Sequence, residues 1–571
     1  MMVFSLVLVV GPGWAAAQGT VAERYKQARE LLSEAPKQAY ELAMGLEPLA
    51  GVDELRVGLL ADAAMAAGMT DEAIELLEAF ARATPDDGHA FRARLDRAEL
   101  LLLVGKGDEA LSLAQSLRGS KIGGRRVERR FFLSRLMRLQ HDIYASRSDD
   151  KGAQARAKSL ARDLIKGYPA EAATKRAGLL VSVEDLSDAE RFGRAKTLFD
   201  TWDYHGAREE FERLYKDAKY QRESRWFLAE IALNRLRDRP KEAEGYFAEL
   251  AKIGPKQEES LYLLARSQMR QERYDDALKT MDRYLAAYPR GTHVQVIHYY
   301  GGWLHYDHRD NERAIVGFRA YMDRYGYRSR HSSYVLGFWA WAHMRLGQWK
   351  EAVGVWEQMR RYGNTLVEGK ALYWQAYALE KLGEQKDAQA RLNVLKSRYS
   401  VSYYGMLGEQ LRAKINGEDA RASQVWWPEG SGTANDRPRK RIDEFPIAGL
   451  NAAQKKSWER VRILVELDER EHARDALKPI YERLIALVPA AERDQWIHAL
   501  GYYVGDYNRM WQLATGGSIS AMPAVPDPKA LRTVMAYPRA YKDIVLSTTG
   551  EFDLPPELMW SIMRQESRYK P

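Results

Sequence analysis

The residue of this sequence with the clearest chemical potential is Glu566, in an amphipathic segment near the end of the chain. At about 100° per residue, Leu558, Met559, Ile562 and Met563 form one apolar stripe, and Glu566 falls on that stripe. A carboxyl group on a buried helix face is costly to ionise, so burial raises its pKa. A carboxylic acid that stays protonated near neutral pH can donate its proton to the leaving oxygen of a glycosidic bond.

The start of this helix and the environment of Glu566 bear on the interpretation as a general acid. Asp553 and Pro555-Pro556 are residue types that begin helices, so the helix is expected to start there. The spacing alone leaves a second interpretation open, in which Glu566 reaches solvent near a chain end. The stripe therefore indicates a candidate general acid without deciding its environment.

Histidines provide the second candidate site. His298, His305, Asp307 and His308 lie close together in the sequence, and His305 and His308 are three residues apart, which places them on one face of a helix. They fall at a predicted turn and lack thiolates or a His-Glu-x-x-His pattern. A solvated turn is the favoured interpretation, and neither a metal nor an organic cofactor is expected.

Basic and aromatic runs have ordinary interpretations as well. The runs Lys121–Arg130 and Arg437–Arg441 could contact phosphates or an acidic polymer, but such runs are usually solvated loops, and no nucleic-acid partner is expected. Six of the 15 tryptophans lie between Trp303 and Trp374. They could stack on sugar rings, although aromatic residues at helical spacing are more typical of a packed core.

These residues must be positioned by more than one compact core, because the chain has 571 residues and single cores stop growing near ~250–300. There is no cysteine, which excludes disulfides, thiolate zinc sites and cysteine nucleophiles. The net charge of +8 is compatible with an anionic partner but is small for this length.

Internal repetition predicts the architecture. A helix rich in leucine or aromatic residues is followed by a polar turn and a second helix that carries an alanine. In the regular part of the chain these alanines recur at intervals of 34 to 38 residues, at Ala207, Ala243, Ala277, Ala314, Ala352 and Ala388. Earlier copies carry Ala73 and Ala110, and the pattern weakens between Ala110 and Ala207, where helix is still expected.

The pattern resembles the tetratricopeptide repeat, whose period is ~34 residues. A small alanine lets two helices pack closely, and neighbouring hairpins must stack to bury their apolar faces. We therefore predict an all-α fold, a superhelix of tetratricopeptide-like helical hairpins over residues 18–411. A loop or linker is predicted at 412–445 and further helical hairpins at 446–536.

The first residues indicate export. Val3–Val10 is apolar, Gly11-Pro12-Gly13 interrupts it, and Ala15-Ala16-Ala17 offers a cleavage site, so residues 1–17 are predicted to be a signal peptide cleaved near Ala17. A basic residue before the apolar run is missing, which leaves a frayed terminus or a misplaced start as alternatives. No integral membrane segment is expected, and the predicted location is the periplasm.

A family resemblance rests on the last part of the chain. Tyr537–Tyr541 followed by Leu554–Tyr569, which contains Gln565-Glu566-Ser567, is similar to the start of the catalytic domain of soluble lytic transglycosylases. Ser402–Leu407 also resembles the segment that closes the helical superstructure of that family. The resemblance implies that residues 537–571 are the N-terminal fragment of a lysozyme-like domain, with Glu566 as the catalytic acid and base.

What the resemblance implies is cleavage of the bond between N-acetylmuramic acid and N-acetylglucosamine in peptidoglycan, leaving a 1,6-anhydro end. The implied partners are peptidoglycan glycan strands, with cell-wall enzymes on the concave repeat surface. The later motifs of the family are absent, because the sequence stops at Pro571. The chain as it stands is expected to be inactive, although its parent protein is expected to be an enzyme. The alternative is a non-catalytic periplasmic scaffold that binds cell-wall or envelope proteins.

Overall fold

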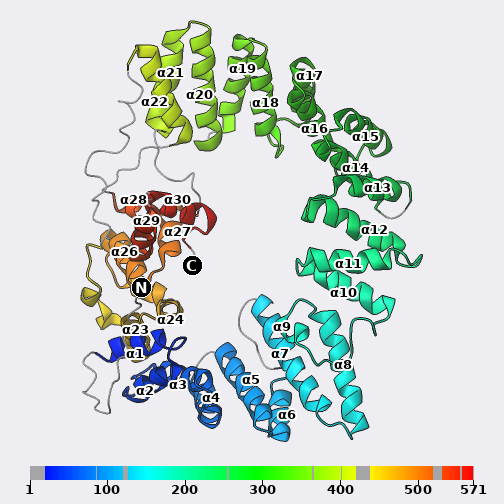
Figure 1. Ribbon diagram of the computed structural model, residues 1–571. Helices are drawn as coiled ribbons and strands as arrows, with labels where there is room; N and C mark the ends of the chain where they lie inside the picture. Colours follow the sequence, from blue (N-terminus) through cyan, green and yellow to red (C-terminus); the bar gives the residue numbers. More distant parts are fainter. Residues whose placement is uncertain are drawn as a thin grey trace, which may run out of the picture. The chain divides into compact units, whose positions relative to one another are not determined.

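The computed structural model describes residues 20–84, 87–119, 126–253, 256–362, 365–399, 402–418, 438–517, 530–552, 554 and 556–569. Every regular element in these ranges is helical (Figure 1), which confirms the predicted all-α class. None of these helices combines the length and the apolar character needed to cross a bilayer.

Several predictions fall on residues outside these ranges. They are the signal peptide at 1–17, most of the linker at 412–445, the first part of the basic run Lys121–Arg130, and the helix-start residues Asp553 and Pro555.

Two units are distinguished by contacts within the chain. One comprises the described residues up to Leu214 together with Pro446–Leu487, and the other comprises the described residues of Tyr215–Phe445 and those from Val488 onward. The helices of the first unit are α1 (Val21–Glu30), α2 (Pro36–Met44), α3 (Asp53–Ala66), α4 (Thr70–Ala83), α5 (Asp87–Leu103), α6 (Gly107–Ser116), α7 (Arg126–Ala145), α8 (Lys151–Gly167), α9 (Ala172–Lys175), α10 (Asp188–Asp200), α11 (Tyr204–Leu214), α23 (Ala452–Glu466), α24 (Arg470–Leu477) and α25 (Tyr481–Ala486).

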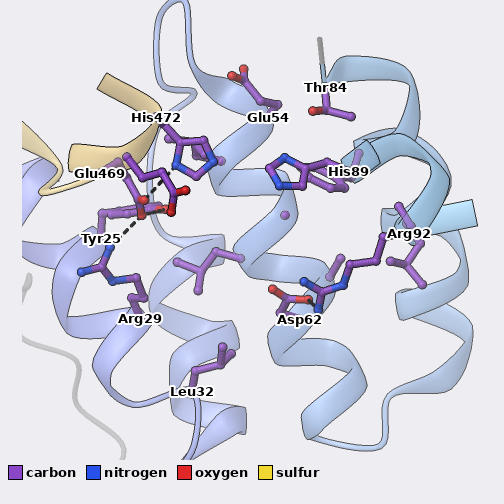
Figure 2. Close-up of a pocket in the computed structure, with 18 of the residues that line it drawn as sticks. Tyr25, Arg29, Leu32, Glu54, Asp62, Thr84, His89, Arg92, Glu469 and His472 are labelled. Atoms are coloured by element: carbon purple, nitrogen blue, oxygen red, sulfur yellow. Dashed lines mark hydrogen bonds and ion pairs between the residues drawn. The ribbon is translucent and has the colours of Figure 1, made fainter. Parts of the chain in front are cut away.

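In this unit, residues more than 400 positions apart meet through charged side chains. Arg460 of α23 donates to the carbonyl oxygen of Gly51 and forms an ion pair with Glu54 of α3. Glu469, just before α24, accepts hydrogen bonds from Tyr25 and Arg29 of α1 (Figure 2). These contacts hold the α23–α24 hairpin against the first helices of the chain.

The second unit continues the repeat. Its helices are α12 (Gln221–Glu230), α13 (Pro240–Leu250), α14 (Gln257–Arg270), α15 (Tyr274–Ala287), α16 (Val294–Asp307), α17 (Asn311–Tyr325), α18 (Ser332–Arg345), α19 (Trp349–Met359), α20 (Thr365–Lys381), α21 (Gln385–Tyr399), α22 (Tyr403–Asn416), α26 (Arg493–Val504), α27 (Tyr507–Thr515), α28 (Leu531–Ala536), α29 (Lys542–Glu551) and α30 (Pro556–Glu566), with a π-helical turn at Ile231–Arg235.

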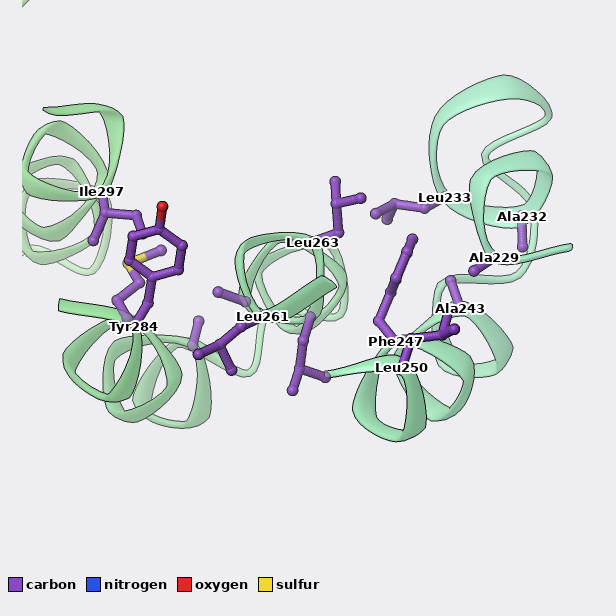
Figure 3. Close-up of a cluster of buried hydrophobic side chains, with 14 of the residues drawn as sticks. Ala229, Ala232, Leu233, Ala243, Phe247, Leu250, Leu261, Leu263, Tyr284 and Ile297 are labelled. Carbon is purple, nitrogen blue, oxygen red and sulfur yellow. The ribbon is translucent and has the colours of Figure 1, made fainter. Parts of the chain in front are cut away.

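Apolar side chains of successive helices interdigitate in this unit. Figure 3 shows Phe247 pointing from α13 toward Leu233 and Leu263 on the neighbouring helical segments, and all three side chains are buried. Between α14 and α15, buried Thr280 donates a hydrogen bond of 2.8 Å to Gln268. One hairpin therefore leaves apolar surface that the next hairpin covers.

The alanine register is confirmed. Each predicted alanine lies in the second helix of a hairpin and is 0% exposed: Ala73, Ala110, Ala207, Ala243, Ala277, Ala314, Ala352 and Ala388. Most of the turns before these helices contain a residue with positive φ, such as Gly347 at 71° and Glu272 at 59°. Because this left-handed conformation costs a residue with a Cβ atom about 1–2 kcal/mol, glycine is favoured there.

The prediction of helix throughout the region between Ala110 and Ala207 is wrong for one segment. The chain between α9 and α10 is irregular. Its backbone is held by side chains of α7, since Arg138 donates to the carbonyl oxygens of Arg176 and Ala177, each at 2.7 Å. These bonds replace the helical hydrogen bonds that the segment does not make, a tertiary arrangement that periodicity cannot indicate.

The aromatic residues between Trp303 and Trp374 belong mainly to the repeat core. Trp356 is 0% exposed, Trp339 is buried, and Trp303, Trp341 and Trp374 pack against the same cluster. Their rings are therefore largely covered by protein, as the core interpretation predicts.

Candidate functional site

Helix α30 carries the predicted catalytic residue and begins at Pro556. It is anchored on one side by Trp560, which is 8% exposed and whose indole Nε1 donates a hydrogen bond of 2.9 Å to the carbonyl oxygen of Ala540. The Arg539 guanidinium lies 5.7 Å from the centroid of the Trp560 ring, and that of Arg564 lies 4.1 Å from the Tyr537 ring. The segment Tyr537–Tyr541, singled out in the sequence, is thus the surface on which α30 packs.

The turn after α30 provides a second anchor. Tyr569 is 2% exposed and packs with Trp511 and Ala540 in a small core, beside the partly buried Met563. Asn508 of α27 donates a hydrogen bond of 2.7 Å to the carbonyl oxygen of Arg568. The middle of α30 and the turn after it are therefore fixed against elements of the same unit.

Glu566, six residues after Trp560, lies about 120° from it around the helix axis and is exposed. Leu558 and Ile562, which precede it by eight and four residues, are 49% and 47% exposed. The prediction that Leu558, Met559, Ile562 and Met563 form one buried stripe is therefore wrong for Leu558 and Ile562. The large Trp560 ring and its hydrogen bond determine which face of α30 packs, and the face that carries Glu566 is left uncovered by the described residues.

The histidines singled out in the sequence have separate partners. His298 lies 2.8 Å from the hydroxyl of Tyr325, and the ring of His308 meets Tyr274 edge to face. His305 lies 3.8 Å from a carboxylate oxygen of Asp310. Within the described ranges the structure does not bring three such ligands together for a metal.

The described parts of the two basic runs are also engaged. Arg130 donates a hydrogen bond of 2.6 Å to the carbonyl oxygen of Gly167 and lies over the ring of Tyr168. Lys440 forms an ion pair of 2.8 Å with Glu492, and Arg441 forms one of 2.9 Å with Asp443. These cations contact the protein's own groups.

A residue that the sequence reasoning missed is Lys370 of α20. Its Nζ lies 4.0 Å from the centroid of the Trp341 ring, close to the backbone of Gly337. Burial lowers the pKa of this amine to about 8. The lysine stands among the tryptophans assigned to the core, and its position depends on two helices meeting, so a sequence pattern contains no signal for it.

Comparisons with known proteins agree with the repeat architecture. A sequence profile described as tetratricopeptide repeat matches residues 59–124, 192–258 and 339–395, and a second profile with that description matches 235–295. A comparison with curated protein sequences found no match. The fold is therefore a tetratricopeptide-like array of helical hairpins.

Several solved structures are also similar to this chain. Soluble lytic transglycosylase Slt70 from Escherichia coli is 16% identical, with 96% of this chain and 77% of that chain covered and a TM-score of 0.39. An inactive variant of lytic transglycosylase Slt from Pseudomonas aeruginosa is 17% identical, with coverages of 95% and 77% and a TM-score of 0.37. Yeast Tom70 is 12% identical, with coverages of 71% and 96% and a TM-score of 0.25.

Proposed function

We propose that this chain is the helical superstructure and the first catalytic helix of a periplasmic peptidoglycan lytic transglycosylase. The observation that carries the proposal is the segment Leu554–Tyr569 with its Gln565-Glu566-Ser567 sequence, which resembles the catalytic motif of that family. Its glutamate is the last residue of a helix that is anchored at its middle and at the turn after it, and Glu566 is exposed. A fixed carboxyl group that substrate can reach is what proton transfer to a glycan requires.

In the proposed reaction, the carboxyl group of Glu566 donates its proton to the oxygen of the glycosidic bond as that bond to C1 of N-acetylmuramic acid breaks. The resulting carboxylate then accepts the proton of the C6 hydroxyl on the same sugar. The C6 oxygen forms a new bond to C1, which gives the 1,6-anhydro product. No water is consumed, so one carboxyl group serves both proton transfers, unlike the paired carboxylates of most glycosidases.

This role requires that a further surface cover the face formed by Leu558, Ile562 and Glu566. An apolar surface there would exclude water from the carboxyl group and raise its pKa, the condition for a general acid near neutral pH. The half-exposed Leu558 and Ile562 offer apolar area for such a surface. The proposed activity therefore belongs to a protein in which a further surface covers this exposed face.

The test is to incubate the full-length protein, isolated from its own cells, with purified sacculi and to analyse the released fragments by mass spectrometry. We expect 1,6-anhydro muropeptides from the native protein and a loss of at least about 100-fold in the Glu566→Gln variant. A Glu551→Gln variant, altered at an exposed position in α29, should retain full release. Undiminished release by the Glu566→Gln variant, or no anhydro product from the native protein, would reject the proposal.

A second candidate function is a non-catalytic scaffold that binds cell-envelope proteins. Large apolar side chains are exposed on the repeat helices, among them Val316 at 69% and Tyr334 at 61%. Tetratricopeptide arrays use such surfaces to bind other proteins. A scaffold would bind its partner equally well with Glu566 or with glutamine at that position, and it would release no anhydro product.

A further inference from the structure

The first unit contains a recess that the proposed catalysis does not use. Its volume is about 620 Å³, and its walls come from α1, α3, α4, α5, α23 and α24 (Figure 2). Recesses of this size hold small molecules or single side chains of a partner. The recess exists because the α23–α24 hairpin packs against the first helices of the chain, so no local sequence pattern could predict it.

On the wall formed by α1 and α24, the polar side chains around Glu469 form hydrogen bonds with one another. Glu469 accepts hydrogen bonds from the hydroxyl of Tyr25 at 3.0 Å and from Arg29 at 2.7 Å, and one of its oxygens lies 3.1 Å from Nδ1 of His472. These partners overcome the effect of burial and lower the pKa of Glu469 to about 2. This group of residues therefore fixes the hairpin, and its charges are already balanced.

The opposite wall carries the carboxylate of Asp62, whose negative charge is only partly compensated by neighbouring cations. Asp62 of α3 lies 3.9 Å from Arg92, and the same guanidinium lies 3.5 Å from Asp96. Arg92 is therefore shared between two carboxylates. Asp96 also lies 2.7 Å from a second guanidinium, that of Arg135. Surrounding protein raises the pKa of Asp62, although its side chain is 45% exposed. Both properties fit a carboxylate on the wall of a recess, enclosed by protein yet open to its interior.

The charge and the apolar surface of the lining residues together indicate which kind of ligand this recess would bind. Its acidic lining residues outnumber its three arginines, although the whole chain has a net charge of +8. The acidic residues are Glu54, Asp62, Asp96, Glu469, Glu471 and Asp475. Leu32, Leu55, Leu77 and Phe80 add apolar surface to the same walls. An aliphatic chain that ends in a positive charge would match both properties.

We propose that this recess is a binding site for a primary ammonium group on an aliphatic chain, with Asp62 as the carboxylate that receives it. The ammonium group would donate hydrogen bonds to Asp62 while its methylene groups contact the leucines and Phe80. Two sources share this chemistry, namely a lysine side chain of a peptide and a free alkyl diamine. The site lies in the first unit, so its existence does not depend on the role proposed for Glu566.

The experiment is a calorimetric titration of the intact chain with three probes: Nα-acetyl-lysine methylamide, the norleucine analogue, which keeps the four side-chain carbons and lacks the charged amino group, and 1,5-diaminopentane. We expect saturable binding of the lysine probe, roughly millimolar for so small a molecule, and none of the norleucine analogue. Stronger binding of the lysine probe than of the diamine would identify a peptide as the source, and the reverse order would identify a free amine.

Two variants locate the binding. Asp62→Asn should weaken it by about tenfold or more, because a charge-assisted hydrogen bond is lost. Asp71→Asn makes the same charge change at an exposed position at the start of α4, outside the recess, and should bind as the native chain does. Matching thermal unfolding of the variants would show that both fold. Equal binding of the lysine and norleucine probes, unchanged binding by Asp62→Asn, or no saturable binding of either amine would overturn the proposal.

Discussion

Phe247 and Trp356 in the repeats of one unit are surrounded by apolar side chains, whereas Glu469 in the other unit is surrounded by hydrogen-bond donors. The first arrangement joins helices that follow one another in the chain, and the second joins segments about 440 residues apart. Contacts between sequential hairpins need not select a partner, because the order of the hairpins along the chain already makes them neighbours. Distant segments need directional bonds that only the correct partner satisfies, and charged hydrogen-bonded pairs provide them.

The largest effect is expected in the apolar repeats. Trp356→Ala should lower the free energy of unfolding by about 3–5 kcal/mol, because it leaves a large cavity at a position with no exposed surface. Denaturation with guanidinium chloride, followed by circular dichroism, measures this loss. Trp202→Ala removes a tryptophan that is 77% exposed, and it should cost much less. Similar losses for the two variants would contradict the claim that apolar burial between successive helices stabilises the repeats.

The polar contacts of Glu469 should rank second. Glu469→Gln is expected to cost about 3 kcal/mol at pH 7, from the lowered pKa and the 14% exposure of its side chain. Because the pKa in the folded protein is below the unfolded value of about 4.3, this stability is present above that pH and is lost as the pH falls toward 2. Unfolding measured at pH 7 and at pH 2.5 tests the trend, with the exposed Glu471→Gln as the control.

His472 should show the opposite dependence on pH. Its hydrogen bond to Glu469 raises its pKa, so its contribution to stability is fully present below the unfolded value of about 6.5. That contribution is lost as the pH rises through the pKa of the folded state. His472→Gln should therefore lower the melting temperature more at pH 5.5 than at pH 9. His205→Gln alters an exposed histidine in the same unit, and a comparable dependence on pH in that variant would refute the explanation.

A smaller effect is expected at the turns between repeat helices. Gly347 has a φ of 71°, so Gly347→Ala should destabilise the second unit by about 1 kcal/mol. Gly354 lies inside α19 with open space around its Cα, and Gly354→Ala should instead stabilise by about 0.5–1 kcal/mol. Unfolding curves for the two variants should therefore shift in opposite directions, and a Gly347→Ala variant as stable as the native chain would show that the turn does not require glycine.

The smallest effect is expected on the uncovered face of α30. Leu558→Ser and Ile562→Ser should each change the free energy of unfolding of this chain by no more than about 0.5 kcal/mol, because both side chains are about half exposed. Trp560→Ala, on the packed face of the same helix, should be clearly destabilising. A large loss of stability in either serine variant would show that other residues of the chain cover this face.

The sequence by itself determined the helical class and the repeat register. The alanines from Ala207 to Ala388 are fully buried, and the tryptophans near Trp356 lie mainly in the core, as their spacing predicted. These properties depend on contacts between neighbouring helices, which recur at a fixed distance along the chain. The sequence also placed Glu566 on a helix and gave it a chemical role that stays a prediction.

The tertiary structure alone decided the rest. Periodicity predicted that Leu558 and Ile562 are buried, but the face that packs is chosen by the hydrogen bond and size of Trp560. The partners of Glu469, the recess beside Asp62 and the desolvated Lys370 each arise where separate elements meet. Spacing along the chain contains no information about such meetings, since each depends on which surfaces remain exposed after the local elements have formed.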